Sequence, residues 1–495
     1  MRWKPSYLIL GTALFAFAWV VTRACVQAIS IDEATTYLGY VQYATPDHWR
    51  VNSNNHVLNS GLMRLVTSLF GLSAFTIRMP AVIGAGLYVW AAVRWCKLAS
   101  TQWFVQWPLL LCLVYNPFVF DYLVAARGYG MAVAFLMLAL VNAAEWLYQP
   151  LERRRSLEAM CGISSVCLAL SFASNFSFAF VDAAALIGLL SMVWVQRTSA
   201  MRLIGMLAIP GVAVIYATVW WTARHFGQGE LWYGAATIGE SLGSLLDATL
   251  YQLNPDLANP QLLPLFAALR PFLLPMLLLS ALAIGSLTWA RKEWRPKFAA
   301  VLALIAVAAF GMHWLGHQYM GLLLPKDRTG LYIVTLLTAA AGMLAGVPAL
   351  SISARAARIA LLGTMFALGL YFVMCLRLNH FKEWPWNANA DKVYARLACM
   401  NHEHVVRYVS SVWMQEAVLN VYRLSSGHET LAKIIDLREE RAGTEVWVTN
   451  YLFDQPLMAE KGLKIIYHDE TEATIAVTPE LAARMEASVC LQFPQ

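Results

Sequence analysis

Two adjacent carboxylates, Asp32 and Glu33, follow directly after the first long apolar segment of the chain. Ionisable side chains at a membrane boundary are costly to place there, so they mark candidate functional sites. A carboxylate beside a low-dielectric region can act as a general base, because partial desolvation raises its basicity. The same stretch fits a capping box, in which Ser30 caps a helix and Glu33 bonds back to the backbone. The dipeptide alone leaves both interpretations open.

Two histidines, His313 and His317, are four residues apart, which places them on one helical face at a spacing that metals can use. The sequence offers no evident third ligand, so we expect a hydrogen-bonded pair near the membrane interface. No cofactor is therefore predicted, although an acidic pair such as Asp32 and Glu33 can hold a divalent ion.

The elements that must position these residues are transmembrane helices. Hydrophobic residues make up 59% of the 495 residues and charged residues 13%, against about a quarter charged in soluble proteins. Long uncharged stretches are each able to cross roughly 30 Å of hydrocarbon as a helix. Backbone groups in lipid must be satisfied within their own segment, which favours helices. The sequence therefore predicts a multi-pass α-helical membrane protein.

Basic residues lie in small groups between the apolar segments, and the net charge of +6 is spread over these groups. If every second connection is cytoplasmic, all the groups fall on the inner side, as the positive-inside rule requires. This distribution argues against nucleic acid as a partner. It predicts an inner N-terminus, an outer C-terminus and a first segment retained as a span. The eleven predicted spans are 6–28, 77–95, 103–120, 129–148, 159–174, 177–195, 203–222, 270–290, 298–315, 330–348 and 358–377.

From about residue 379 the composition is that of a soluble domain. Residues 404–413, 445–450, 463–469 and 473–477 are typical of strands, with helical spacing at 415–426 and expected helices near 454–461 and 479–487. We therefore predict a transmembrane domain over 1–378, with long outer loops at 29–76 and 223–269, and a small α/β domain over 379–495. Because that domain is predicted to lie outside, Cys399 and Cys490 are hypothesised to form a disulfide.

Several stretches, taken in order, resemble the GT-C superfamily of membrane glycosyltransferases. The similarity is to the branch that contains protein O-mannosyltransferases, aminoarabinose transferases and related lipopolysaccharide-modifying enzymes. An acidic pair follows the first span, and the match then covers a second helix, a turn at Phe70-Gly71 and an Arg-x-Pro at 78–80. Similar segments lie at 121–140 and 325–342. The sequence departs from the family where Asn54-Asn55-His56 replaces the usual Pro-Pro, and where Ala34-Thr35-Thr36 lacks a frequent Arg.

The resemblance implies transfer of a single sugar from a polyprenyl-phosphate carrier to an acceptor on the outer face, with inversion. Asp32 would then remove the acceptor's proton, and Glu33 would orient the acceptor or tune Asp32. Cationic side chains should neutralise the lipid phosphate as it leaves. Arg328, Lys326 and Arg127 are the candidates, since Arg binds phosphate through two parallel hydrogen bonds. The alternative for all three is a side chain that extends along lipid to reach water.

The substrate-binding candidates are His56, Asn55, Tyr129, Trp232 and Tyr233. Most of the other tryptophans lie near predicted span ends, where an aromatic belt is expected. Arg78, at the start of the second span, is interpreted as a structural anchor.

Two other functions remain open: an oligosaccharide polymerase or ligase, and a transporter or flippase of lipid-linked sugars. A transporter should show intramembrane charges along a path, for which Asp182 and Glu145 are the candidates. The predicted partners are a polyprenyl-phosphate sugar, the bilayer, and a glycan, lipid or protein acceptor. The predicted location is a bacterial inner membrane with the C-terminal domain outside the cytoplasm.

Overall fold

The computed structural model describes residues 5–43, 54–148, 156–195, 199–220, 233–258, 260–261, 263–403, 406–427, 430–439, 441–485 and 490. The chain divides into two compact units. The membrane unit comprises Met1–Val21, Arg50–Asn59 and Pro80–Arg377. The C-terminal unit comprises Thr22–Trp49, Ser60–Met79 and Leu378–Gln495, so it includes the segment after the first span as well as the end of the chain. The predicted domain boundary at residue 379 stays a prediction.

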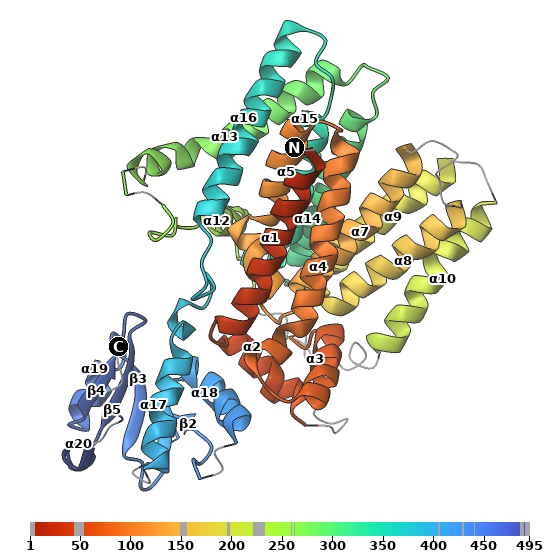
Figure 1. The fold of residues 1–495 in the computed structure, drawn as a ribbon. Helices are drawn as coiled ribbons and strands as arrows, with labels where there is room; N and C mark the ends of the chain where they lie inside the picture. The colour runs from red at the N-terminus through yellow and green to blue at the C-terminus, as the bar shows by residue number, and fades with distance from the viewer. Residues whose placement is uncertain are drawn as a thin grey trace. The chain divides into compact units, whose positions relative to one another are not determined.

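Long helices dominate the first 377 residues (Figure 1). They are α1 (Pro5–Val26), α2 (Ile31–Thr36), α3 (Val57–Phe70), α4 (Ala74–Ala99), α5 (Trp103–Val114), α6 (Pro117–Val124), α7 (Tyr129–Tyr148), α8 (Leu157–Ser174), α9 (Ala179–Val195), α10 (Ala200–Thr218), α12 (Ile238–Thr249), α13 (Leu263–Thr288), α14 (Arg295–Met320), α15 (Leu331–Ala345) and α16 (Ile352–Met374). Short helical turns follow α2 at Tyr37–Val41 and precede α9 and α15 at Phe176–Phe178 and Asp327–Gly330.

Nine of the described helices are long and apolar enough to cross a membrane, or up to ten if the bent pair α5 and α6 is one span. That pair bends by 58° because α5 ends at Val114 and Pro117 begins α6, with the Asn116 side chain accepting a hydrogen bond from the Phe118 amide. The predicted span at 177–195 corresponds to α9, which is shorter, with 17 residues. The number of eleven spans therefore stays a prediction.

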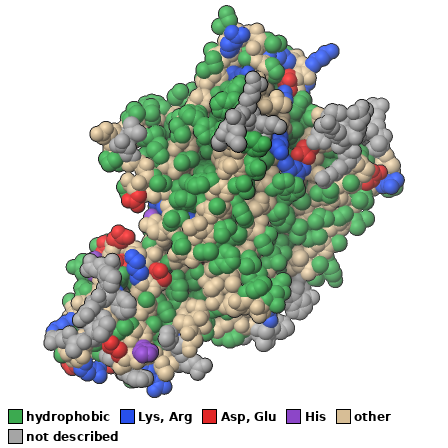
Figure 2. Space-filling model, viewed as in Figure 1, with side chains coloured by type: hydrophobic (Ala, Val, Ile, Leu, Met, Phe, Trp, Pro, Cys, Tyr) green, Lys and Arg blue, Asp and Glu red, His purple; other side chains and the backbone are tan. Residues whose placement is uncertain are grey.

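Many apolar side chains of the long helices are exposed on the surface that would contact lipid. On α13, Leu265, Phe272 and Leu279 are 54%, 60% and 67% exposed. Figure 2 shows hydrophobic side chains over much of the viewed face of the long helices. Since exposed apolar area of this extent is rare on water-soluble monomers, the prediction of a multi-pass helical membrane protein is confirmed.

The end of the chain, residues 390–490, folds into helices and one small sheet, together called the C-terminal α/β layer. Its elements are α17 (Ala390–His402), β1 (Val409–Ser411), α18 (Trp413–Ser426), β2 (Ile435–Asp436), β3 (Val446–Asn450), α19 (Gln455–Glu460), β4 (Lys464–His468), β5 (Ala473–Val477) and α20 (Pro479–Met485). The five strands are ordered β2-β1-β3-β5-β4, with β1 parallel to β2 and β3, and β5 antiparallel to β3 and β4. The predicted small α/β domain is confirmed.

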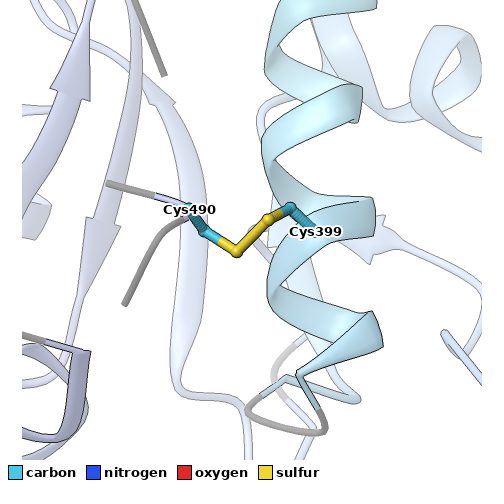
Figure 3. The surroundings of a disulfide bond; sticks show 2 residues. All are labelled: Cys399 and Cys490. Carbon is cyan, nitrogen blue, oxygen red and sulfur yellow. A yellow bond between two sulfur atoms is a disulfide. The ribbon is translucent and has the colours of Figure 1, made fainter. Parts of the chain in front are cut away.

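The core of this layer is apolar and is closed by a disulfide. Buried side chains of α17, of the central strands and of α20 pack together, among them Leu397, Val448, Ile475 and Leu481. Cys399 on α17 and Cys490 near the C-terminus are joined by a disulfide (Figure 3). The hypothesised pairing is therefore present in the structure.

Candidate active site

The acidic pair lies on α2, and its two carboxylates have different surroundings. Ser30 caps the helix, and Glu33 completes a capping box, because the Ser30 amide donates to Glu33 Oε2 at 2.9 Å. Glu33 is buried, whereas Asp32 is half-buried and takes no part in that box. Glu33 therefore forms the capping box that the sequence allows. Asp32 stays the candidate general base.

Arg78 holds Glu33 from the start of α4. Its Nε donates to Glu33 Oε1 at 2.8 Å and its Nη2 to Glu33 Oε2 at 2.7 Å, and both side chains are fully buried. The remaining guanidinium hydrogens go to backbone carbonyls at the end of α1, Gln27 at 2.6 Å and Ala28 at 2.7 Å. Arg78 therefore ties α4 to both α1 and α2, which agrees with its interpretation as a structural anchor.

Side chains from the end of the chain also hold the start of α2. The Ile29 amide donates to the Tyr422 hydroxyl at 3.0 Å, and the Ile31 amide donates to Asn387 Oδ1 at 3.0 Å. Asn387 is itself fixed, because its amide nitrogen donates to the Met414 carbonyl at 2.9 Å. The first amides of a helix lack partners within it. Here two backbone amides that flank the Ser30 cap find partners more than 350 residues away along the chain.

A second polar cluster lies in the membrane unit, around His56. Its imidazole is buried against the edge of Tyr129, with ring centroids 5.6 Å apart, and Asn175 lies 3.5 Å from its Nε2. Asn175 also donates to the Arg127 carbonyl at 3.2 Å, and the Arg127 guanidinium donates to Asn54. Three segments distant in sequence therefore meet at this point.

The backbone beside His56 admits only glycine. Gly128 has a φ of +75°, and a Cβ placed on it would lie 2.0 Å from the Ser174 carbonyl oxygen. Any side chain here would therefore separate the Arg127 turn from the end of α8. The close approach keeps Arg127 and Asn175 in the same cluster.

His56 is neutral in this cluster. Burial, followed by the positive charges of Arg127 and Arg328, holds the pKa of His56 well below its usual value of 6.5. Both arginines therefore act on the same buried imidazole. Two positive charges that act on one buried site favour the binding of an anion there.

Arg328 packs against Tyr233, which precedes α12. Its guanidinium lies 4.1 Å from the centroid of the Tyr233 ring, and the Tyr233 hydroxyl donates to Asp327 Oδ2 at 3.3 Å. The neighbouring Lys326 pairs with Glu240 of α12 at 2.8 Å. Among the predicted cations, Arg127 lies in the His56 cluster, Arg328 acts on His56 through its charge, and Lys326 forms an ion pair with a carboxylate.

The other predicted residues have the following places. Asn55 is fully buried next to His56 in the chain, and Tyr129 begins α7. Trp232 lies outside the described residues. Asp32 and Glu33 belong to the C-terminal unit, and the cluster around His56 belongs to the membrane unit.

Two residues of the cluster, Asn54 and Asn175, were not predicted to have individual roles in a site. Asn175 follows α8 in what the sequence suggests is only a turn, yet its side chain caps the short helix before α9. The sequence feature that could have identified Asn175 is an asparagine between two apolar spans, because a polar side chain there needs partners.

Four further residues singled out from the sequence, His313, His317, Glu145 and Asp182, lie in the long helices. His313 and His317 each bond a loop carbonyl, of Leu323 at 2.9 Å and of Leu322 at 2.5 Å. Glu145 pairs with Arg94 at 2.7 Å, and Asp182 is buried beside Ser171. The histidine pair therefore matches its interpretation as a hydrogen-bonded pair.

A bundle of long apolar helices, a short acidic helix after the first span and an α/β domain at the chain's end make up the fold, and solved membrane proteins share it. The chain is similar to ArnT from Cupriavidus metallidurans, in a crystal structure bound to undecaprenyl phosphate, with a TM-score of 0.56. The sequence identity is 14%, over 96% of this chain and 98% of ArnT. It is also similar to the arabinofuranosyltransferase AftD from Mycobacteria, with a TM-score of 0.50 and 13% identity, over 95% of this chain and 40% of AftD.

No protein-family model matches the chain, and no curated protein matches it in sequence. The similarity to solved structures confirms the predicted GT-C resemblance at the level of the fold.

Proposed function

We propose that the protein is an inverting glycosyltransferase that moves a single sugar from a polyprenyl-phosphate carrier to an acceptor hydroxyl or amine. The observation that carries this proposal is the buried polar cluster of His56, Arg127 and Asn175, on whose imidazole the positive charge of Arg328 also acts. Two guanidinium groups can take the negative charge of a phosphate as it leaves, and they act more strongly away from water. ArnT, which shares the fold, was solved with undecaprenyl phosphate, and this supports a lipid-phosphate donor.

In the proposed reaction, the acceptor oxygen or nitrogen attacks the anomeric carbon from the face opposite the phosphate. The bond from that carbon to the phosphate oxygen breaks, and the electron pair leaves with the polyprenyl phosphate. Asp32 takes the acceptor's proton, and Arg127 and Arg328 neutralise the leaving phosphate. Glu33 is a positioning residue that fixes α2, because its oxygens accept bonds from Arg78 and Ser30.

The remaining predicted roles are parts of the same proposal. His56, Asn55 and Tyr129 would line the donor site, and Tyr233 and Trp232 would bind the sugar or acceptor. Lys326 would contribute positive charge near Arg328. The reaction is placed on the outer face of a bacterial inner membrane, with the C-terminal domain on that side.

The test is sugar transfer by purified protein with a panel of radiolabelled polyprenyl-phosphate sugars. Wild type is compared with Asp32→Asn, Arg328→Ala and Arg127→Ala. We expect transfer by wild type with at least one donor. The expected loss is about a hundredfold or more for the base variant, and a similar loss in the arginine variants, which remove charge stabilisation.

Two exposed residues supply matched controls. Asp256→Asn makes the same carboxylate-to-amide change at an exposed position of the predicted outer loop 223–269, and Arg202→Gln removes an exposed cation. Both should retain wild-type transfer. Equal activity in wild type and Asp32→Asn would remove Asp32 from the mechanism. Saturable binding of the lipid-linked sugar without turnover in any protein would instead favour a transporter.

A further inference from the structure

Helix α12, in the long fourth outer loop, has two faces of different character. Ile238, Leu242 and Leu246 recur every four residues, and they are 46%, 46% and 50% exposed. Ser241 and Leu245, by contrast, are buried. The spacing places the three exposed side chains in one stripe along the helix. We call these three residues the α12 stripe.

The buried face of α12 is bonded to the loop that carries Arg328. The Ser241 hydroxyl donates to the Pro325 carbonyl, and the Asp327 amide donates to Ser244 Oγ at 2.9 Å. Lys326 pairs with Glu240 at the start of the helix. These three contacts hold the α12 stripe within about one helix diameter, about 10 Å, of the loop.

The α12 stripe also adjoins a span that faces lipid. Asp247, next to Leu246, lies 3.8 Å from Arg270 of α13 in an ion pair. Near that arginine, α13 exposes Leu265, Leu269 and Phe272. Helix α12 is therefore bonded on one side to the Arg328 loop and on another to a span that exposes apolar side chains.

We propose that the α12 stripe binds the isoprenoid chain of the donor, beyond the phosphate held at Arg127 and Arg328. This inference rests on the proposed function, because it takes the phosphate to lie at those arginines. A chain that leaves that phosphate must reach hydrocarbon. The element bonded to the Arg328 loop offers a row of branched aliphatic side chains along the way. Contact with a branched, apolar chain removes their exposed area from water.

The experiment uses the full chain in phosphatidylcholine nanodiscs, with Leu242→Ser and Leu246→Ser combined. Two donors are compared: the full-length undecaprenyl-phosphate sugar and a donor truncated to its first isoprene unit. We expect the KM for the full-length donor to rise about tenfold, since two half-exposed leucines lose their apolar contact. The KM for the truncated donor and both kcat values should stay the same, because the Arg328 loop is unchanged.

Leu279→Ser combined with Leu282→Ser on α13 is the matched control, since these leucines are 67% and 61% exposed. It should leave both KM values unchanged. A second measurement, binding of undecaprenyl phosphate without transfer, should weaken by the same factor as the KM in the α12 variant.

Three results would contradict the inference. Equal KM changes for both donors would mean that the substitutions displace the Arg328 loop. Unchanged KM and unchanged lipid binding would mean that the stripe contacts only the bilayer. Full-length transfer lost through kcat alone would also exclude a role in chain binding. By contrast, a wild type that transfers no sugar but whose binding of undecaprenyl phosphate depends on the stripe would refute the proposed function alone.

Discussion

Asp32 and Glu33 are neighbours in sequence but differ in what surrounds them. The sequence indicates either a catalytic pair or a capping box, and the structure assigns the capping box to Glu33. Its carboxylate lies in a fully buried ion pair with Arg78, whereas Asp32 stays half-buried on the same turn. The division of roles between the two carboxylates follows from Arg78, which is 45 residues away along the chain.

The buried pair leads to a prediction about stability. Glu33→Gln should lower the free energy of unfolding by about 3–5 kcal/mol, because it leaves the Arg78 charge buried without its partner. Asp32→Asn should change it by less than about 1 kcal/mol. Denaturant unfolding of the purified protein in detergent, followed by tryptophan fluorescence, measures both. A similar loss in the two variants would show that Asp32 is also structural.

His56 leads to a prediction about pH. Since the pKa of folded His56 lies well below 6.5, the unfolded chain takes up a proton first as the pH falls. The stability from this neutral histidine is complete above about pH 6.5 and is lost progressively below it. Thermal unfolding in detergent should therefore show a Tm that decreases from pH 7 to pH 5, and His56→Gln should make that decrease smaller.

The control is His402→Gln, which replaces an exposed histidine and should leave the slope of Tm against pH as in wild type. An identical slope in His56→Gln and wild type would mean that His56 is not neutral.

At the scale of elements, the short helix α2 depends on distant parts of the chain. Six residues are too few for a stable isolated helix. Its cap at Ser30 is local, but the neighbouring amides of Ile29 and Ile31 bond Tyr422 and Asn387. The C-terminal α/β layer is therefore a support for the helix that carries Asp32.

The hydrogen bonds from Asn387 and Tyr422 to α2 lead to a prediction that kcat falls while KM stays the same. Asn387→Ala and Tyr422→Phe each remove a hydrogen bond worth about 0.5–1.5 kcal/mol, so kcat should fall by roughly threefold to tenfold. The KM for the donor should stay unchanged, because the arginine cluster belongs to the membrane unit. Asn387→Asp keeps the accepting oxygen and should recover part of the loss. A change in KM with kcat unchanged would instead indicate a role in substrate recognition.

Elements with strong periodicity or clear boundaries were predictable from the sequence. Strands β3, β4 and β5 and helix α18 lie where the alternation and helical spacing place them. Helix α17 and the two-residue strand β2 were not predicted. Strand β1 has three residues of the ten expected at 404–413. Short strands of this kind depend on pairing with neighbours, and β1 pairs with β2 and β3, so local preference alone could not define their ends.

At the scale of the whole molecule, the candidate site depends on contacts that periodicity does not encode. Arg127 and Arg328 could be chosen from the sequence by type and position. The contacts that join Arg127, Asn54, His56 and Asn175 require the packing of three separate segments, and the charge of Arg328 on a fourth segment acts on the same imidazole. At Asn54-Asn55-His56 the sequence departs from the family pattern, and these contacts explain the departure, since Asn54 accepts a bond from Arg127 and His56 belongs to the same cluster.

The disulfide leads to a prediction about the C-terminal layer. Cys399 and Cys490 are 91 residues apart, and a cross-link of this length stabilises a fold by about 2–5 kcal/mol. Cys399→Ser combined with Cys490→Ser should therefore increase cleavage of the C-terminal layer by a protease at moderate temperature. Cys96→Ser, a buried cysteine in α4, is the control for loss of a thiol. Equal cleavage of the double variant and wild type would show that the bridge adds no stability.

The same disulfide bears on the orientation of the whole protein. A bridge persists in oxidising compartments, and the positive-inside distribution independently predicts an outer C-terminus. In intact cells, an impermeant maleimide should label Ser425→Cys, an exposed position on α18, and should leave Ser353→Cys on α16 unlabelled until the cells are opened. Both variants need Cys25→Ser, because Cys25 is exposed. Labelling of position 353 but not position 425 in intact cells would reverse the predicted orientation. It would also place Asp32 on the cytoplasmic face, because the predicted 29–76 connection is on the same side as the C-terminus.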